Sequence, residues 1–264
     1  VSNELTFAVV VAHPDDDAYG FAGSVAKHAD DPGFRFVLIH ATDGGGGDIR
    51  DGFPATRETL GRIRQAEDED GWWALGREPD RHVWMGYTDG EVDQVPFDEL
   101  VDAVGAILDE EQPTVVGTFG PDGIFAHPDH IAIGAATDAA FLRSAATSGR
   151  AFRRLLHGAI PQSVFERWQE QRAAKGLELF DPTHVYHMRG VPDDEIGLVI
   201  DCRDVAHRIV AGLMEHRSQH HVMFDYPVDA ERWERVVSRD WATIAWPERT
   251  ASAPLLTDIF EGLP

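Results

Sequence analysis

The stretch VVVAHPDDDAYGFAG, residues 9–23, decides the fold, because it joins a buried strand to a cluster of polar side chains. It begins within a continuous apolar run, LTFAVVVA (5–12), and turns abruptly into a histidine, a proline and three consecutive aspartates. A second apolar run of similar length, FRFVLIHA (34–41), follows after a helix-length segment. Runs spaced in this way are typical of parallel strands that are buried on both faces and joined by crossover helices.

The same alternation of strands and helices continues along the chain. Further strands are predicted at 81–86, 113–120, 153–160 and 195–201, and helices at 55–76, 97–111, 131–146 and 203–220. This order predicts an α/β fold with a Rossmann-like, doubly wound, mainly parallel sheet that carries helices on both faces. We expect a single domain over residues 1–264, with residues 221–264 as a C-terminal wrap or lid, because no repeat, linker or change of composition divides the chain.

The charge of the chain limits its partners. It has 46 acidic and 23 basic residues, a formal net charge of −23. Such a charge repels phosphate backbones and anionic lipids, so we expect no nucleic-acid and no membrane partner. The single cysteine, Cys202, excludes an internal disulfide and a multi-cysteine zinc site, and we expect a cytoplasmic protein. The sequence leaves open whether the chain forms a homo-oligomer.

Four predicted strands end in polar or glycine-rich loops, at AHPDDD (12–17), ATDGGGGD (41–48), GYTDGE (86–91) and FGPDGIFAHPDH (119–130). Loops of this kind converge at one rim of a parallel sheet, where ligands bind. Two of them carry side chains that a divalent metal prefers, namely His13, Asp15, Asp16 and Asp17 in the first and His127, Asp129 and His130 in the last. A bound cation would offset the repulsion among the three neighbouring aspartates. It would also let one carboxylate coordinate while a neighbour accepts a proton.

These residues carry a family resemblance. The segments VVVAHPDDDAYGFAGSVAKH (9–28) and FGPDGIFAHPDHIAIG (119–134) resemble the AHPDDE and HPDH motifs of the LmbE-like, or PIG-L, zinc-dependent de-N-acetylases. Looser matches are found at 56–76, 83–92 and 191–220. The last of these is similar to the mycothiol-pathway branch of the family, which contains a deacetylase and a conjugate amidase.

The resemblance implies that His13, Asp16 and His130 bind one zinc ion, although iron or cobalt could occupy a site with two histidines and one aspartate nearly as well. It implies that Asp15 is the general base that activates water. The implied reaction removes an acetyl, or another acyl, group from the amine of an N-acetylglucosamine-like sugar or glycoconjugate. The partner would therefore be a small amino sugar, and the bond broken would be a linear C–N amide bond.

Other roles follow from the same resemblance. His127 would stabilise the oxyanion or protonate the leaving amine, and Asp129 could orient and polarise a histidine. Arg64 and Asp89 lie where the family places substrate-contacting residues. The chain departs from the family at Phe125, where mycothiol-pathway members have a tyrosine whose hydroxyl can hold the oxyanion.

Asp17 is a second departure, since it replaces the glutamate of the family motif and is one methylene shorter. Two other functions also stay open at this point. One is an amidase that cleaves a larger acyl amide, such as a mycothiol conjugate. The other is a non-catalytic, Rossmann-like module that binds a sugar or a nucleotide, in which the histidine and aspartate cluster is structural.

Overall fold

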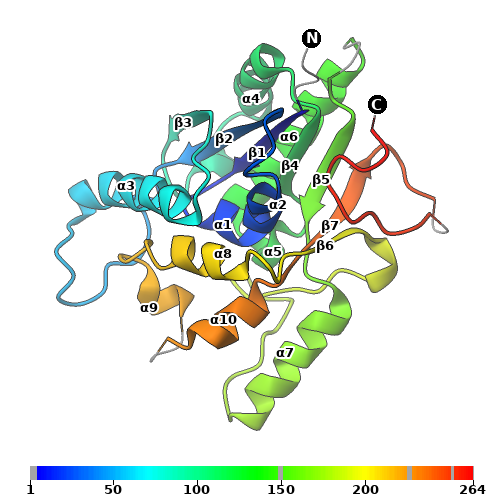
Figure 1. The fold of residues 1–264 in the computed structure, drawn as a ribbon. Helices are drawn as coiled ribbons and strands as arrows, with labels where there is room; N and C mark the ends of the chain where they lie inside the picture. The colour runs from blue at the N-terminus through cyan, green and yellow to red at the C-terminus, as the bar shows by residue number, and fades with distance from the viewer. Residues whose placement is uncertain (1–4, 148–150, 225–227, 251–252, 264) are drawn as a thin grey trace.

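The structure is a computed structural model that describes residues 5–147, 151–224, 228–250 and 253–263. In these ranges one seven-stranded sheet runs through the molecule in the order β3-β2-β1-β4-β5-β7-β6 (Figure 1). The strands are β1 (Leu5–Val11), β2 (Phe34–Thr42), β3 (Arg81–Tyr87), β4 (Val115–Phe119), β5 (Arg154–Gly158), β6 (Ile196–Asp201) and β7 (Arg239–Trp246). The first five are parallel, and β7 is antiparallel to both neighbours. The predicted α/β fold with a mainly parallel sheet is therefore confirmed.

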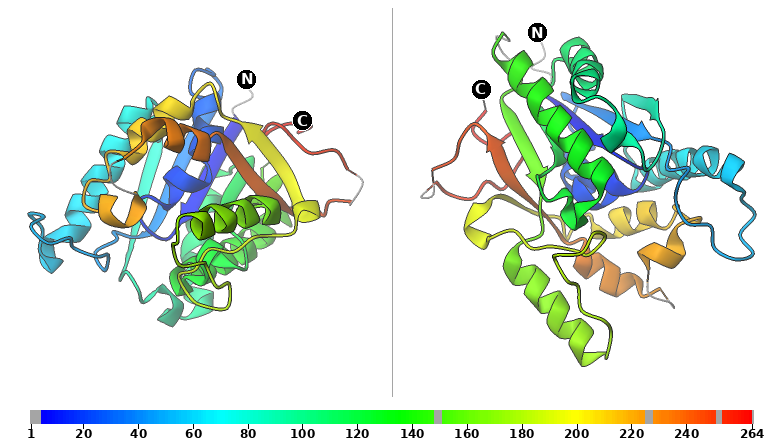
Figure 2. Two further views of the ribbon diagram at one scale, coloured as in Figure 1. Left: turned by 90° about the horizontal axis from the view of Figure 1, so that it is seen from below. Right: turned by 180° about the vertical axis from the view of Figure 1, so that it is seen from behind.

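Helices cover both faces of this sheet. They are α1 (Asp16–Gly20), α2 (Ala22–Lys27), α3 (Arg57–Leu75), α4 (Phe97–Glu111), α5 (Gly123–Ala126), α6 (Pro128–Ala145), α7 (Gln162–Ala174), α8 (Ala206–Leu213), α9 (His220–Met223) and α10 (Ala230–Val236), with short 3-10 turns at Val92–Gln94 and Asp193–Glu195. The α1–α2 pair, α3 and α8 lie over one face in Figure 1, and α4 and α6 lie over the other in the view from behind in Figure 2. Among the described helices, none combines the length and the apolar character needed to cross a membrane.

Strand β1 lies at the centre of the core because its sequence allows it to be buried on both faces. From Thr6 to Val11 every residue is buried, and β2 pairs with it in register from Leu5↔Phe34 to Val11↔His40. Strand β4 pairs with its other edge. The chain leaves β1 toward β2 on one side, whereas β4 and β5 extend the sheet on the other. The carboxyl ends of β1 and β4 thus form the topological switch point at which α/β sheets bind ligands.

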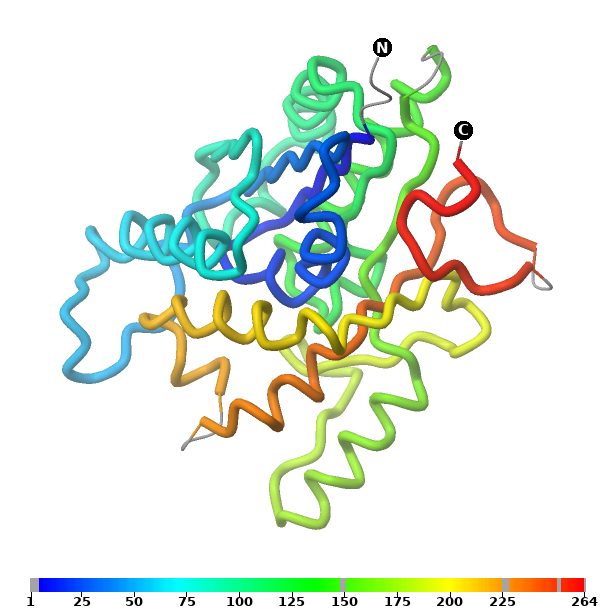
Figure 3. Tube along the Cα trace, viewed as in Figure 1, coloured from blue at the N-terminus to red at the C-terminus, as the bar shows by residue number. Residues whose placement is uncertain are grey.

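The C-terminal third differs from the sequence expectation in two places. Residues 239–246, inside the segment expected to form a wrap or lid, form β7 between β5 and β6. This strand escaped prediction because it begins with Arg239 and Asp240 and lacks a continuous apolar run. The helix predicted at 203–220 is also too long, since α8 ends at Leu213 and the chain then turns before α9, as the tube in Figure 3 shows.

Candidate metal and active site

Three predicted metal ligands meet at the switch point. His13 follows β1, Asp16 begins α1, and His130 lies in the first turn of α6. The Nδ1 of His13 lies 3.2 Å from an oxygen of Asp16 and 3.2 Å from Nε2 of His130, which is in turn 3.2 Å from the other oxygen of Asp16. Donor atoms about 2.0–2.1 Å from a tetrahedral zinc ion are about 3.3 Å apart, so this donor set fits such an ion.

The hydrogen bonds around the two histidines set their tautomers. The Nδ1 of His130 faces the carbonyl oxygen of Gly123 at 3.1 Å, and the Nε2 of His13 faces Asp89 at 3.0 Å and Asp129 at 3.3 Å. Each of these nitrogens faces an acceptor and therefore carries the hydrogen in a neutral ring. The other nitrogen of each ring then directs its lone pair at the other ring and at Asp16. Two lone pairs facing each other need a proton on one ring or a metal ion between them, and the two oxygens of Asp16 beside both nitrogens complete a donor set for a metal.

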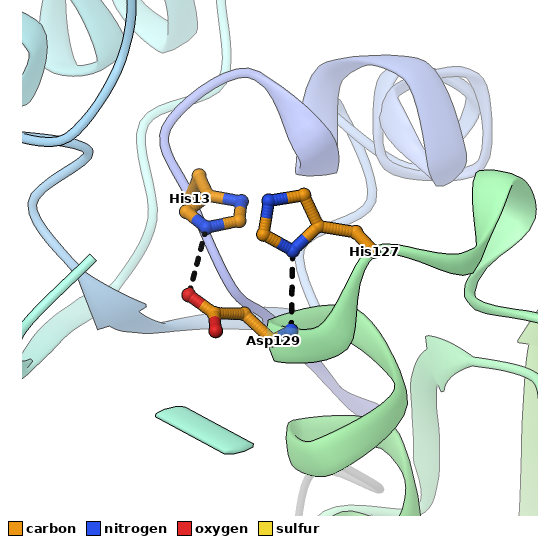
Figure 4. A group of neighbouring side chains, drawn as sticks. All are labelled: His13, His127 and Asp129. Carbon is orange, nitrogen blue, oxygen red and sulfur yellow. Dashed lines mark hydrogen bonds and ion pairs between the residues drawn. The ribbon is translucent and has the colours of Figure 1, made fainter. Parts of the chain in front are cut away.

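Asp129 holds His13 in this orientation. Figure 4 shows its carboxylate reaching the ring of His13, while its backbone nitrogen reaches His127. The same carboxylate accepts hydrogen bonds from the backbone nitrogens of Gly90, at 2.7 Å, and Val92, at 3.1 Å. Burial raises the pKa of Asp129, but the hydrogen bonds to His13 and Gly90 outweigh it and leave the pKa below its usual value. Asp129 is therefore ionised, and the histidine that it contacts through its side chain is His13.

His13 sits in a field of carboxylates that favours positive charge. Burial lowers the pKa of His13, but hydrogen bonds to Asp129, Asp16 and Asp89 leave it well above its usual value. Burial likewise raises the pKa of Asp16, yet the charge of His130 and the hydrogen bonds to both histidines hold it well below its usual value. Both shifts have the direction expected where carboxylates surround a positive charge, either a proton on His13 or a bound cation.

Asp15 lies beside these ligands in a strained backbone conformation. Its φ is 92°, in the left-handed region that side chains other than glycine rarely adopt, and such strain is found most often at functional sites. The guanidinium of Arg64 donates to Asp15 at 3.1 Å and to the carbonyl oxygens of Pro14 and Gly44 at 2.7 and 2.9 Å. Burial raises the pKa of Asp15 to about 7, although the charge of Arg64 opposes the rise. Arg64 thus positions Asp15, and its contact with a substrate stays a prediction.

His127 faces His13 with its ring, and the two ring centroids are 4.7 Å apart (Figure 4). His127 is the N-cap of α6, and its Nδ1 accepts a hydrogen bond from the backbone nitrogen of Asp129 at 3.1 Å. Its hydrogen therefore lies on Nε2. Burial and the nearby His13 and His130 lower the pKa of His127 to about 4, so the ring is a neutral donor.

A groove beside the site is formed by the glycine-rich loop after β2 and the loop after β3. It has a volume of about 430 Å³ and is lined by Asp43, Gly45, Gly46, Arg57, Gly86, Tyr87, Thr88 and Asp89. Asp89 joins the two loops, because one of its oxygens accepts from the backbone nitrogen of Gly46 at 2.8 Å while the other faces His13. The contact of Asp89 with His13 was not predicted, and its contact with a substrate stays a prediction.

Asp17 lies behind the site rather than in it. Its carboxylate is buried, accepts from the indole Nε1 of Trp72 at 2.6 Å, and lies 3.2 Å from Nε2 of His40. Burial raises the pKa of Asp17, but the hydrogen bond and charge of His40 outweigh it and leave the pKa lowered. The shorter side chain therefore finds direct partners on β2 and α3.

Tyr186 is an aromatic neighbour that the sequence analysis did not identify. Its ring meets that of His127 edge-on with centroids 5.3 Å apart, and its backbone nitrogen donates to the carbonyl oxygen of Phe125 at 2.8 Å. The side chain is 63% exposed at the edge of the site. No local motif marks Tyr186, because it lies more than fifty residues beyond His127 in a segment without helix or strand periodicity.

Comparison with known proteins agrees with this geometry. Residues 8–141, half of the chain, match the family model PIG-L, described as GlcNAc-PI de-N-acetylase. The chain belongs to this family. The matched region runs from β1 into α6 and so contains both of the loops that supply the three metal-ligand candidates.

Relatives of this chain include a Saccharopolyspora erythraea protein, 1D-myo-inositol 2-acetamido-2-deoxy-alpha-D-glucopyranoside deacetylase 2. It is 29% identical over 239 residues, which cover 80% of this chain and 82% of that protein. The fold is similar to that of N,N'-diacetylchitobiose deacetylase from Pyrococcus horikoshii, with a TM-score of 0.57 and 22% identity over 88% of this chain and 75% of that one. It is also similar to that of 4-carboxy-2-hydroxymuconate hydratase from Pseudomonas putida, with a TM-score of 0.63 and 15% identity over 95% of this chain and all of that one. The last comparison shows that this fold alone does not specify deacetylation.

Proposed function

We propose that the chain is a zinc-dependent N-deacetylase that removes an acetyl group from the amine of an N-acetylglucosamine-like sugar or glycoconjugate. The observation that carries this proposal is the arrangement of facing nitrogens on His13 and His130 with both oxygens of Asp16, next to the partly buried carboxylate of Asp15. Family membership and the names of the relatives support the substrate class.

Three residues would hold the metal, through Nδ1 of His13, Nε2 of His130 and the carboxylate of Asp16. A bound zinc ion would supply Lewis-acid chemistry, which polarises a carbonyl group and makes water easier to deprotonate. Asp129 and Asp89 keep the second nitrogen of His13 protonated, and Gly123 does the same for His130. Hydrolysis of an amide needs both effects, because an amide carbonyl is a poor electrophile.

Asp15 would move the proton. Its carboxylate is held by Arg64 at the edge of the metal ligands, where it could accept a proton from water. The proton accepted from water would then reach the leaving amine. Arg64 keeps the acceptor oxygen in place and limits how far burial can raise the pKa.

His127 would stabilise the oxyanion rather than protonate the amine. A doubly protonated His127 would direct its Nδ1 hydrogen at the backbone hydrogen of Asp129, so the N-cap contact favours the neutral ring. The neutral ring presents an N–H donor at Nε2, and a donor fixed in a partly buried site is well suited to a developing negative charge. This assigns to His127 the hydrogen bond that Phe125 cannot donate.

The proposal is tested by metal analysis combined with an assay for release of free amine. Purified protein would be assayed with N-acetylglucosamine, its inositol and chitobiose glycosides, and a cysteinyl amide of glucosamine. We expect zinc in the protein and release of acetate from the N-acetyl sugars, and the variant His130→Ala should lose the zinc ion of this site together with the release of acetate. Cleavage of the cysteinyl amide alone would replace the deacetylase with the amidase, and zinc without hydrolysis of any of these compounds would contradict both.

A further inference from the structure

A second cluster of histidine and carboxylate side chains lies apart from the three predicted ligands. It consists of His40 on β2, His82 on β3 and Asp68 on α3, with one ring nitrogen from each histidine and one carboxylate oxygen all within 4.8 Å of one another. The three elements adjoin at the β3 edge of the sheet (Figure 1). His40 and Asp68 are fully buried, and the side chain of His82 is 14% exposed. A small solute could therefore reach the cluster from the side of His82.

Asp68 is the member of this cluster that the fold leaves unexplained. Both of its carboxylate oxygens are buried, and in the described part of the chain neither has a hydrogen bond of normal geometry, although the backbone of Asp15 and the carboxyl group of Asp17 lie close enough to influence its pKa. In the part of the chain that is described, its ion-pair partners are His40 and His82, each at 3.7 Å, which is too long for a hydrogen bond. Burial and the neighbouring Asp17 raise the pKa of Asp68 well above its usual value, and the backbone of Asp15 offsets only part of this rise. A buried carboxylate of this kind normally has a cation or several donors beside it.

The two histidines direct one nitrogen each at the other, in a hydrogen bond that a bound metal ion would replace. His40 Nε2 lies 3.2 Å from Asp17, and its Nδ1 lies 3.0 Å from Nε2 of His82. A carboxylate that accepts the hydrogen of one ring nitrogen frees the other nitrogen to coordinate. Both rings also pack against Trp84, with centroids 4.4 Å away, which limits their rotation.

We propose that His40, His82 and Asp68 bind a second divalent transition-metal ion, separate from the one at His13, Asp16 and His130. Two neutral imidazoles and a carboxylate are a donor set that suits zinc, cobalt or iron. With a divalent cation bound, its two positive charges would offset the ionised carboxylates of Asp68 and Asp17. The ion would tie β3, the edge strand, to β2 and α3, and would hold Asp17 behind the first site. This inference does not depend on the proposed deacetylase activity.

The competing explanation is a neutral Asp68 carboxyl group. A cavity of about 10 Å³, lined by Asp68, His216 and apolar side chains, adjoins the cluster, and Nδ1 of His216 also lacks a hydrogen-bond partner. A single water molecule there could satisfy both groups. Replacing Asp68 by asparagine separates the two explanations. An amide can replace a neutral carboxyl group at a water, whereas it is a much poorer metal ligand.

The test compares metal content among variants of the full chain. Protein stripped with a chelator would be reloaded with Zn²⁺ at a buffered low free concentration, which prevents weak binding to the acidic surface. The variants are Asp68→Asn, the matched control Asp70→Asn on the exposed side of the same helix, and His130→Ala at the first site. His82→Gln, with the exposed His207→Gln as its control, provides a milder change in case Asp68→Asn fails to fold. Reloading with Co²⁺ reports the ligand geometry through visible absorption.

We expect about two zinc ions per chain in the parent protein and in Asp70→Asn, and about one in Asp68→Asn, His82→Gln and His130→Ala. Chelation should also lower the melting temperature of the parent protein by more than that of Asp68→Asn. The proposal is overturned if the parent protein and Asp68→Asn bind the same amount of zinc. It is also overturned if removing the metal changes the stability of neither protein. A failure of deacetylase activity would not affect either measurement.

Discussion

At the scale of single residues, three consecutive aspartates differ because their neighbours differ. Asp15 faces Arg64 and is partly buried, and its pKa is raised to about 7. Asp16 faces His13 and His130, and its pKa is well below the usual value despite burial. Asp17 points the other way, toward His40 and Trp72, and its pKa is also lowered. The left-handed backbone at Asp15 helps to separate the three carboxylates. The sequence DDD alone does not predict this backbone conformation.

The role of Asp15 gives a prediction at this scale. The variant Asp15→Asn should keep its metal, because the side chain contacts Arg64 and not the ligand atoms. It should lose about 10²–10⁴-fold in kcat, the usual contribution of a positioned general base. Zinc content and steady-state rates would be measured together, with Asp51→Asn in the exposed part of the neighbouring loop as the control. An Asp15→Asn protein with the parent rate would remove Asp15 from the mechanism.

At the scale of elements, the parts of the site that were predicted are those that are local in sequence. His13 and Asp16 follow one apolar run, and His127 and His130 open one helix, so strand-end and N-cap patterns suffice to find them. The contacts of Asp89 with His13 and of Tyr186 with His127 depend on how separate loops pack, and no short pattern encodes that packing. Strand β7 escaped prediction for a related reason, since its residues are only partly buried and lack a long apolar run.

Strand β7 is fastened to α2 by a buried carboxylate. Asp240 on β7 accepts hydrogen bonds from the backbone nitrogen and the hydroxyl group of Ser24, at 2.6 and 2.8 Å. The approach requires a glycine at position 23, where an added Cβ would lie 2.6 Å from Asp240 and 2.3 Å from the sulfur of Cys202. Burial raises the pKa of Asp240 to about 6, although the hydrogen bonds from Ser24 oppose the rise.

The burial of Asp240 predicts a pH dependence of stability. The pKa of Asp240 is raised from 3.8 to about 6, so its contribution to the free energy of unfolding is fully present below pH 3.8 and is lost as the pH rises through 6. Relative to Asp240→Asn, the parent protein should therefore lose up to about 3 kcal/mol between pH 4 and pH 7. Urea unfolding at several pH values would measure the difference. The exposed Asp30→Asn is the control, and a difference that is constant with pH would contradict the assignment.

At the scale of the whole molecule, the acidic residues buried in the two clusters and those on the surface have different roles. The acidic residues of the two clusters lie in the interior near histidines, whereas many of the other acidic residues in the described ranges are exposed. The net charge of −23 on 264 residues therefore acts mainly as self-repulsion of the surface. With twice as many acidic as basic residues, exposed ion pairs offset only part of this repulsion, and each such pair contributes little.

Screening of this repulsion gives the last prediction. The Debye length falls from about 10 Å at 0.1 M salt to about 3 Å at 1 M, so added KCl should raise the free energy of unfolding by weakening repulsion among exposed carboxylates. The triple variant Glu69→Lys, Glu78→Lys, Glu170→Lys reverses three exposed charges and should show a smaller gain from the same salt. Denaturation by urea, which is uncharged, would be followed at each KCl concentration for both proteins. If stability were indifferent to salt, or if both proteins gained equally, surface repulsion would not be the cause, and the acidic composition would need another explanation.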